Sequence, residues 1–96
     1  MTKSDIVSQI SEQTGMEKGD VQATVEAFMR AVRSNLESGE NVYLRGFGSF
    51  VVKTRAAKTG RNILAKKAIQ IPAHNIPSFK PSKDFVENVK TNVKVQ

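Results

Sequence analysis

Apolar positions in the first forty residues recur with the period of an α-helix. A stripe spaced by three and four residues predicts a long helix from about Lys18 to Ser38. The members of this stripe are Val21, Val25, Phe28, Met29, Val32 and Leu36. Its regular period predicts that Phe28 and Met29 pack in a core. A shorter helix is predicted before it, because Thr2 and Asp5 have the spacing of a capping box. Gly15 and Gly39 are the predicted ends of the two helices, since glycine readily adopts the left-handed conformation of a helix stop.

After residue 40 the apolar positions alternate instead, as they do in β-strands. The segment 41–55 is rich in Val, Tyr and Phe and contains Gly46 and Gly48, which predicts two strands around a tight turn. The segment 68–79 alternates apolar and polar residues and predicts a third strand. Its two prolines cannot donate ladder hydrogen bonds, so we expect this strand at a sheet edge. Ser82 is a good N-cap for a last helix with an apolar face.

The segment 53–68 interrupts these patterns, because it is polar and basic and has almost no core residues. Both of its flanks continue strand patterns, so we expect a long two-stranded ribbon that projects into solvent as an arm, at about residues 53–72. A disordered basic loop is the alternative. The prediction is a single α+β domain over residues 1–96, with a helical part (1–40), a three-stranded antiparallel sheet that carries the arm (41–81) and a C-terminal helix (82–96).

Charge is distributed unevenly along the chain. Between Glu40 and Asp84 there are nine lysines and arginines and no acidic residue, so this window carries +9 while the rest of the chain carries −3. Such a separation predicts a positive surface for a polyanion, and nucleic acid is the commonest polyanion in a cell.

Composition excludes several kinds of chemistry. The chain has no cysteine, which rules out disulfides, thiolate zinc sites and thiol catalysis. His74 is the only histidine and has no partner that the sequence reveals, while Asp84 and Glu87 suit the first turns of a helix rather than a catalytic pair. We therefore predict a protein that is not an enzyme and has no metal, cofactor or small-molecule substrate. The N-terminus lacks the apolar core of a signal peptide and no segment could span a bilayer, so we expect a soluble, cytoplasmic protein without a membrane partner.

Three short motifs make the chain similar to the HU/IHF family of bacterial histone-like DNA-binding proteins. The motifs are Gly46-Phe47-Gly48-Ser49-Phe50, Ile69-x-Ile71-Pro72-Ala73 and Ile76-Pro77-x-Phe79-Lys80, with the basic ribbon between the first two. The resemblance covers essentially the whole chain. It implies an intertwined dimer, expected to be a homodimer, whose helices share one core and whose arms hold double-stranded DNA through the minor groove and bend it. A nucleoid location follows from the same resemblance.

The resemblance also implies which residues bind DNA. They are Lys3, Arg45, Lys53, Arg55, Lys58, Arg61, Asn62, Ile63, Lys66, Lys67, Lys80 and Lys83. Gly46 and Gly48 let the backbone turn sharply and come close to a phosphate. The chain departs from the family at the tip of the arm, where Ile63 replaces the usual wedge proline and Lys66 replaces a glycine. We expect Ile63 still to insert between base pairs, because aliphatic side chains do so at minor-groove kinks. For any single lysine, a solvated surface charge is the alternative.

The function predicted from these features is architectural. The chain should bind DNA largely without sequence specificity, prefer bent, nicked or junction DNA, and help to compact the bacterial chromosome. Phe47, Phe50 and Phe79 are expected in an aromatic core rather than in stacking on bases. Two other classes remain open: an RNA-binding or ribosome-associated basic module, and a module whose ribbon docks on an acidic protein.

Overall fold

The computed structural model describes the backbone of residues 1–62 and 67–95, and the side chains of residues 1–58 and 70–95. The described residues form three helices and five strands. They are α1 (Lys3–Thr14), α2 (Lys18–Glu37), β1 (Val42–Leu44), β2 (Gly48–Arg55), β3 (Lys58–Asn62), β4 (Lys67–Ile71), β5 (His74–Pro81) and α3 (Lys83–Asn92). No helix in this part of the chain is long and apolar enough to cross a membrane.

The predicted caps and stops of the helices are present, but α3 ends at Asn92, earlier than the C-terminal helix predicted over 82–96. The hydroxyl of Thr2 accepts from the Asp5 backbone N–H at 3.3 Å, and the Asp5 carboxylate accepts from the Thr2 N–H at 2.9 Å, which completes the capping box of α1. Gly15 ends α1 at φ +75° and Gly39 follows α2 at φ +89°, both in the left-handed region. Ser82 caps α3 by accepting from the Phe85 N–H at 3.3 Å.

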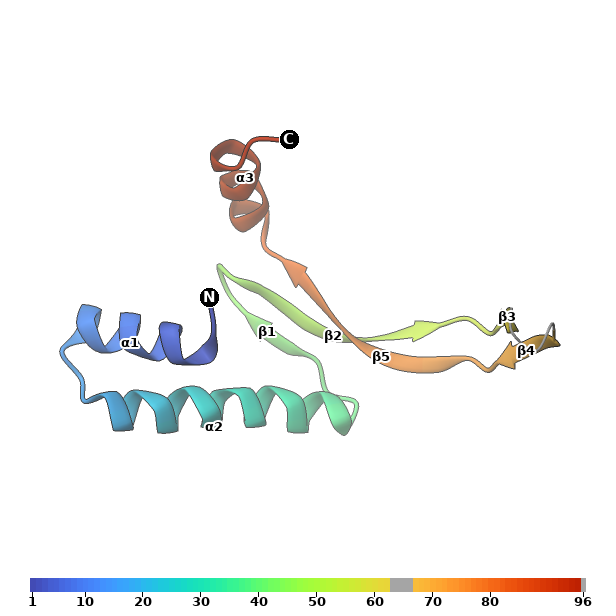
Figure 1. Ribbon diagram of the computed structural model, residues 1–96, viewed down its shortest axis with the longest axis horizontal. Coiled ribbons are helices and arrows are strands. Elements are labelled where there is room, and N and C mark those ends of the chain that lie inside the picture. The colour runs from blue at the N-terminus through green and yellow to red at the C-terminus, as the bar shows by residue number, and fades with distance from the viewer. Residues whose placement is uncertain (63–66, 96) are drawn as a thin grey trace.

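The sheet has the strand order β1-β2-β5, and all its pairs are antiparallel. The predicted third strand is divided in two, because Pro72 and Ala73 separate β4 from β5. Within this sheet β5 pairs only with β2, which confirms the expected edge position of the proline-containing strand. Strands β3 and β4 pair with each other beyond β2 and β5 and form the outer part of the arm, which extends away from the body in Figure 1.

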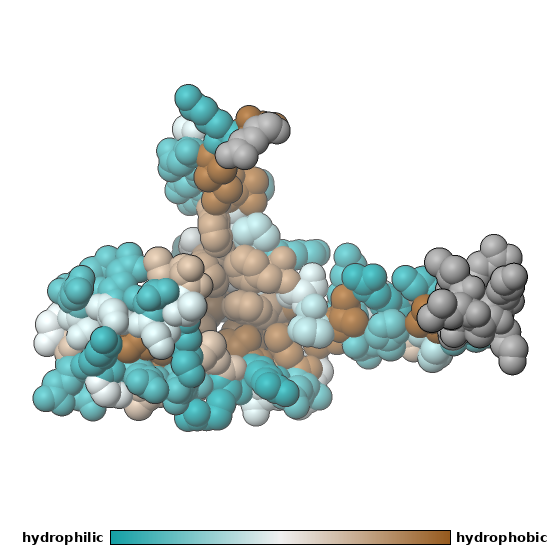
Figure 2. Space-filling view, viewed as in Figure 1, coloured by the Kyte–Doolittle hydropathy of each residue, from teal (hydrophilic) through white to brown (hydrophobic). Residues whose placement is uncertain are grey.

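The core of the single chain is small. Among the described hydrophobic residues, only Val7 and Val21 are buried, where α1 packs on α2. Phe28 and Met29 on α2 are 47% and 44% exposed, although the helical stripe predicts them in a core. Figure 2 shows apolar surface gathered in the middle of the body and continuing onto α3, which stands apart from the helical pair in Figure 1. Apolar surface of this extent is typical of an interaction site.

Candidate nucleic-acid interface

The two faces of the sheet differ in composition, although Val51 and Ile76 lie on the more polar face and the pair Thr54–Asn75 lies on the more apolar one. Residues paired across antiparallel strands project to the same side, and successive residues project to opposite sides. The pairs Val42–Phe50, Phe50–Phe79 and Val52–Pro77 therefore define an apolar face. The pairs Tyr43–Ser49, Ser49–Lys80, Val51–Ser78, Lys53–Ile76 and Arg55–His74 define the opposite side, which we call the polar face. Three of the predicted DNA-binding residues, Lys53, Arg55 and Lys80, thus share one face.

Most of the described cations in this region have no carboxylate partner. The ion pairs among the described residues are Lys3–Glu26 at 2.9 Å and Arg33–Glu37 at 3.0 Å, and both lie in the helical part. The cations without a described ion pair include Arg45, Lys53, Arg55, Lys58, Lys80 and Lys83, and all of them are exposed. Because no acidic side chain neutralises them, they create a positive potential along the polar face and the base of the arm.

Lys3 is the exception among the predicted contacts. Its ammonium group donates to Oε1 of Glu26, and Nε2 of Gln22 donates to the same carboxylate oxygen at 3.3 Å. The hydrogen bond from Lys3 is the first cause, and that from Gln22 the second, of a lowered Glu26 pKa. The ion pair of Glu26 is thus with Lys3 on α1, and not with Arg30, which lies four residues further along α2. A phosphate would have to share or displace this carboxylate to reach Lys3.

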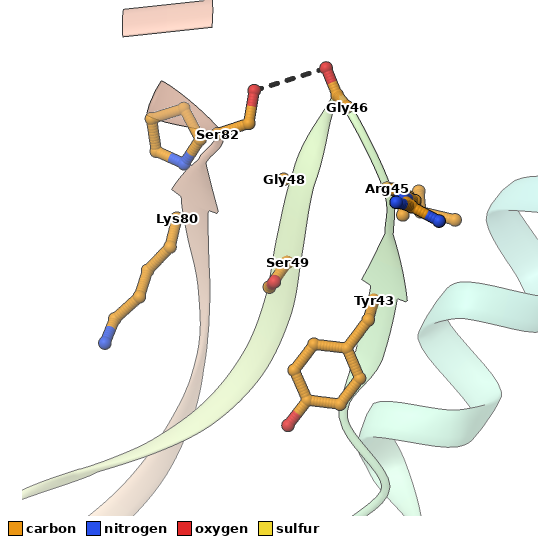
Figure 3. Close-up of a pocket in the computed structure, with 9 residues that line it drawn as sticks. Tyr43, Arg45, Gly46, Gly48, Ser49, Lys80 and Ser82 are labelled. Atoms are coloured by element: carbon orange, nitrogen blue, oxygen red, sulfur yellow. Dashed lines mark hydrogen bonds between the residues drawn. The ribbon is translucent and has the colours of Figure 1, made fainter. Parts of the chain in front are cut away.

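The turn after β1 is fastened to the start of α3. The N–H of Phe47 donates to the Leu44 carbonyl at 3.0 Å, and the Ser82 N–H donates to the Phe47 carbonyl at 2.9 Å. The Ser82 hydroxyl donates to the Gly46 carbonyl at 3.2 Å (Figure 3). Gly46 has φ +84° and open space around its missing side chain, as expected for a turn glycine that a ligand could approach.

Gly48 has a different role from Gly46. It is buried, and a Cβ at this position would lie 2.5 Å from the Lys80 carbonyl oxygen and 2.7 Å from the Phe79 ring. The glycine is thus required by the close packing of β2 on β5, whereas the sequence had suggested close approach of a phosphate. The packed ring of Phe79 lies 5.1 Å from that of Phe47 and 4.8 Å from that of Phe50. The three rings contact one another as predicted, but Phe47 and Phe79 are 45% and 37% exposed, so the single chain does not enclose them in a core. Phe85 adds a stacked contact 5.5 Å from Phe47.

A hollow of about 430 Å³ lies on the body beside this turn. Its lining residues are Tyr43, Leu44, Arg45, Gly46, Gly48, Ser49, Lys80, Pro81 and Ser82 (Figure 3). The hollow brings together Arg45 and Lys80, which are 35 residues apart in the sequence. Sequence reasoning missed Tyr43 and Ser49 as polar lining. Their alternation with Val42, Leu44 and Phe50 was the available signal.

Three further predicted residues belong to the arm. Arg61 and Asn62 are in β3 and Lys67 begins β4, and the register pairs Asn62 with Lys67. Ile63 and Lys66 lie outside the described residues. The described part of the chain has no group of three metal-ligating side chains of the His, Cys, Asp or Glu type.

Comparison with known proteins identifies the family. The profile of the family described as bacterial DNA-binding protein matches residues 1–90. The chain belongs to this family. It is 43% identical over 90 residues to the DNA-binding protein HU of Thermus thermophilus, covering 94% of this chain and 93% of the relative. It is 41% identical over 95 residues to the integration host factor subunit beta of Marinobacter nauticus, covering 98% and 97%.

A solved structure agrees with this family assignment. The Anabaena HU–DNA cocrystal structure superimposes with a TM-score of 0.89 at 34% identity, and the match covers 93% of this chain and 97% of that one. The resemblance to the HU/IHF family and the α+β fold class predicted from the sequence are both confirmed.

Proposed function

We propose that this chain is an architectural DNA-binding protein that acts as a homodimer and bends the duplex it holds. The observation that carries the proposal is the division of the sheet, with Lys53, Arg55 and Lys80 unpaired on one face and Phe50 and Phe79 on the other. One face thereby offers charge to a polyanion and the other offers apolar surface to a partner chain. Membership of the bacterial DNA-binding family supports DNA as the polyanion and a non-enzymatic role.

The second copy of the chain occupies the apolar groove between α2 and the sheet. This groove measures about 950 Å³ and is lined mainly by apolar side chains, including Phe28, Met29, Val32 and Phe50. A twofold axis would bring the same patch of two chains together, so that these residues would be buried in both protomers. A shared core also resolves the problem of size, since the described residues of this 96-residue chain bury only two hydrophobic side chains, and so small a core gives a monomer little stability.

The two arms of the dimer hold DNA through its minor groove. Lys53 and Arg55 at the base of the arm and Lys58 at the start of β3 meet phosphates and release counterions. Ile63 at the tip inserts between base pairs, and the cost of unstacking is offset by the additional contacts that bent DNA permits. Sequence preference is weak, because the minor groove offers a degenerate pattern of donors and acceptors.

The relatives of this chain indicate where the protein works. The Anabaena relative was crystallised with DNA, and the curated relatives are bacterial. We place this chain on chromosomal DNA in the bacterial cytoplasm, where bending by many dimers compacts the nucleoid. The basic ribbon would also suit RNA, but the match to a DNA-bound relative over nearly the whole chain favours DNA.

A titration onto two DNA molecules of equal length tests this proposal. One is a straight duplex and the other contains a nick or a four-way junction, each at low and moderate salt. We expect tighter binding to the distorted DNA, because part of its deformation has already been made. The logarithm of the binding constant should fall steeply with the logarithm of the salt concentration. The slope should be about −11 if Arg45, Lys53, Arg55, Lys58, Lys80 and Lys83 meet phosphates in both chains of a dimer. Equal affinity for both molecules would contradict the bending function.

A further inference from the structure

His74, the only histidine of the chain, lies where the body passes into the outer part of the arm. It forms the last pair of the β2–β5 ladder, opposite Arg55, and the β3–β4 ladder begins at Lys58 (Figure 1). Between the two ladders each strand has two unpaired residues, 56–57 on one strand and 72–73 on the other. The histidine therefore stands beside the cations at the base of the arm.

One nitrogen of the imidazole is held by the protein and the other is not. Nδ1 lies 3.0 Å from the carbonyl oxygen of Pro72, inside the break between the ladders. A carbonyl only accepts, so Nδ1 carries the hydrogen of the neutral ring and donates it in this bond. Nε2 then has a lone pair, and no described residue bonds to it. Because the side chain is exposed, Nε2 is accessible to a ligand.

The charged groups around the ring on its own side of the sheet are cations. Arg55 stands opposite His74, and Lys53 lies two residues away on the same face of β2. Lys58 follows at the start of β3. All three are exposed and have no ion pair among the described residues. The described residues of the polar face thus include no carboxylate that would bind a protonated imidazole.

The opposite side of the sheet adds no net charge. There α2 borders the apolar groove, and its charged lining residues are Arg33 and Glu37. These two are paired with each other at 3.0 Å. A charge on His74 would therefore be balanced by an anion from outside the chain.

We propose that His74 is a pH-dependent phosphate contact at the base of the arm, which strengthens DNA binding when its ring is protonated. Protonation adds a positive charge and an N–H donor at Nε2, while the bond from Nδ1 to Pro72 is kept. The ring thus becomes a third cation beside Lys53 and Arg55 without having to move. A phosphate next to the ring favours its charged form, so binding of the duplex and uptake of a proton support each other. This inference rests on the proposed DNA-binding function and adds its regulation by pH.

A titration at two pH values tests the contact. Wild type should bind a nicked duplex about five- to tenfold more tightly at about pH 5.5 than at about pH 8, because each dimer gains two exposed charge contacts. The salt slope should steepen by about 1.8 per dimer over the same change. His74→Asn is the matched variant, since its side-chain N–H takes the place of Nδ1–H toward Pro72 but the amide does not ionise. It keeps every other ionisable group, so the difference between the two proteins isolates the imidazole.

Two further measurements separate charge from structure. His74→Lys carries a permanent charge and should show at about pH 8 the steeper salt slope that wild type reaches only in acid. Calorimetry in two buffers of different ionisation enthalpy counts the protons that binding takes up. Near pH 6.5 wild type should take up more protons than His74→Asn, by at most about one per chain.

The possible results are distinguishable. If wild type and His74→Asn respond equally to pH and take up equal numbers of protons, the contact is overturned, while the proposed function stands on the comparison of straight and distorted DNA. If His74→Asn weakens binding equally at both pH values, the ring only supports the break in the ribbon, and the contact is again overturned. A wild-type protein that binds neither DNA molecule would overturn both proposals. Thermal unfolding at both pH values checks that each variant is folded, and His74→Lys supplies the comparison if His74→Asn is not.

Discussion

Replacing Gly48 by alanine tests how the sheet is held together beneath the polar face. The added Cβ would lie 2.5 Å from the Lys80 carbonyl oxygen and 2.7 Å from two atoms of the Phe79 ring, whereas ordinary contacts begin at 3.4 Å. The carbonyl belongs to the β2–β5 ladder and the ring is packed between Phe47 and Phe50. The Lys80 carbonyl is backbone, so it cannot move by nearly 1 Å without disturbing this ladder, and a shift of the Phe79 ring would alter its contacts with Phe47 and Phe50.

The expected cost follows from these contacts. Overpacking a rigid site costs typically 1–3 kcal/mol, and two blocked directions place Gly48→Ala near the upper end. Alanine restricts the unfolded chain and returns about 0.4–1 kcal/mol, which leaves a net loss of about 2 kcal/mol. For a domain of this size that loss lowers the melting temperature by roughly 8–16 °C.

Circular dichroism during thermal unfolding measures this loss. Protein concentration must be held fixed, because the unfolding of a dimer depends on it. Gly19→Ala is the matched control, since Gly19 lies in α2 with nothing within 4 Å of the added Cβ, and this change should stabilise the protein by about 0.5–1 kcal/mol. A Gly48→Ala protein that melts within about 2 °C of wild type would refute the packing role. If it also bound DNA weakly, close approach of a phosphate would explain the glycine instead.

Three further predictions concern charge and the arm. Glu26→Gln should release Lys3, tighten DNA binding and steepen the salt slope by about 1.8 per dimer, and an unchanged slope would show that Lys3 meets no phosphate. Ile63→Ala should reduce the bend angle of a short duplex measured by energy transfer between its ends, and an unchanged angle would refute the wedge. The pKa of Asp5 is lowered mainly by the backbone N–H of Thr2, from an ordinary value of 3.8, so its contribution to stability is present above that value and lost as the pH falls through the folded pKa. Melting temperature should therefore fall less at acid pH in Asp5→Asn than in wild type, and parallel curves would refute the cap's contribution.

The local signals in the sequence determined most of the secondary structure. Thr2 with Asp5, Gly15 and Ser82 act within a few residues of themselves, so the caps and stops they predict need no knowledge of the tertiary structure. The strand patterns on both flanks of the basic segment predicted a ribbon, and its lack of apolar residues predicted that the ribbon projects into solvent. The division of the third strand at Pro72 and Ala73 was missed, since alternation continues across the break.

The site was only partly predictable for the same physical reason. Charge counting found Lys53, Arg55 and Lys80, because an excess of cations is visible without a structure. It could not show that Tyr43, Ser49 and Lys80 lie side by side on the polar face, because only the two antiparallel ladders fix which residues stand opposite one another.

The sequence by itself determined the helices, the arm and the positive charge of this protein, because each depends on residues near one another in the chain. Only the tertiary structure decided the roles of the glycines and the fate of the apolar stripe. Gly46 and Gly48 look equivalent in sequence, yet one has a positive φ in open space and the other is buried against β5. The stripe predicted Phe28 and Met29 in a core, but one chain leaves them nearly half exposed, since two helices and a narrow sheet cannot enclose them.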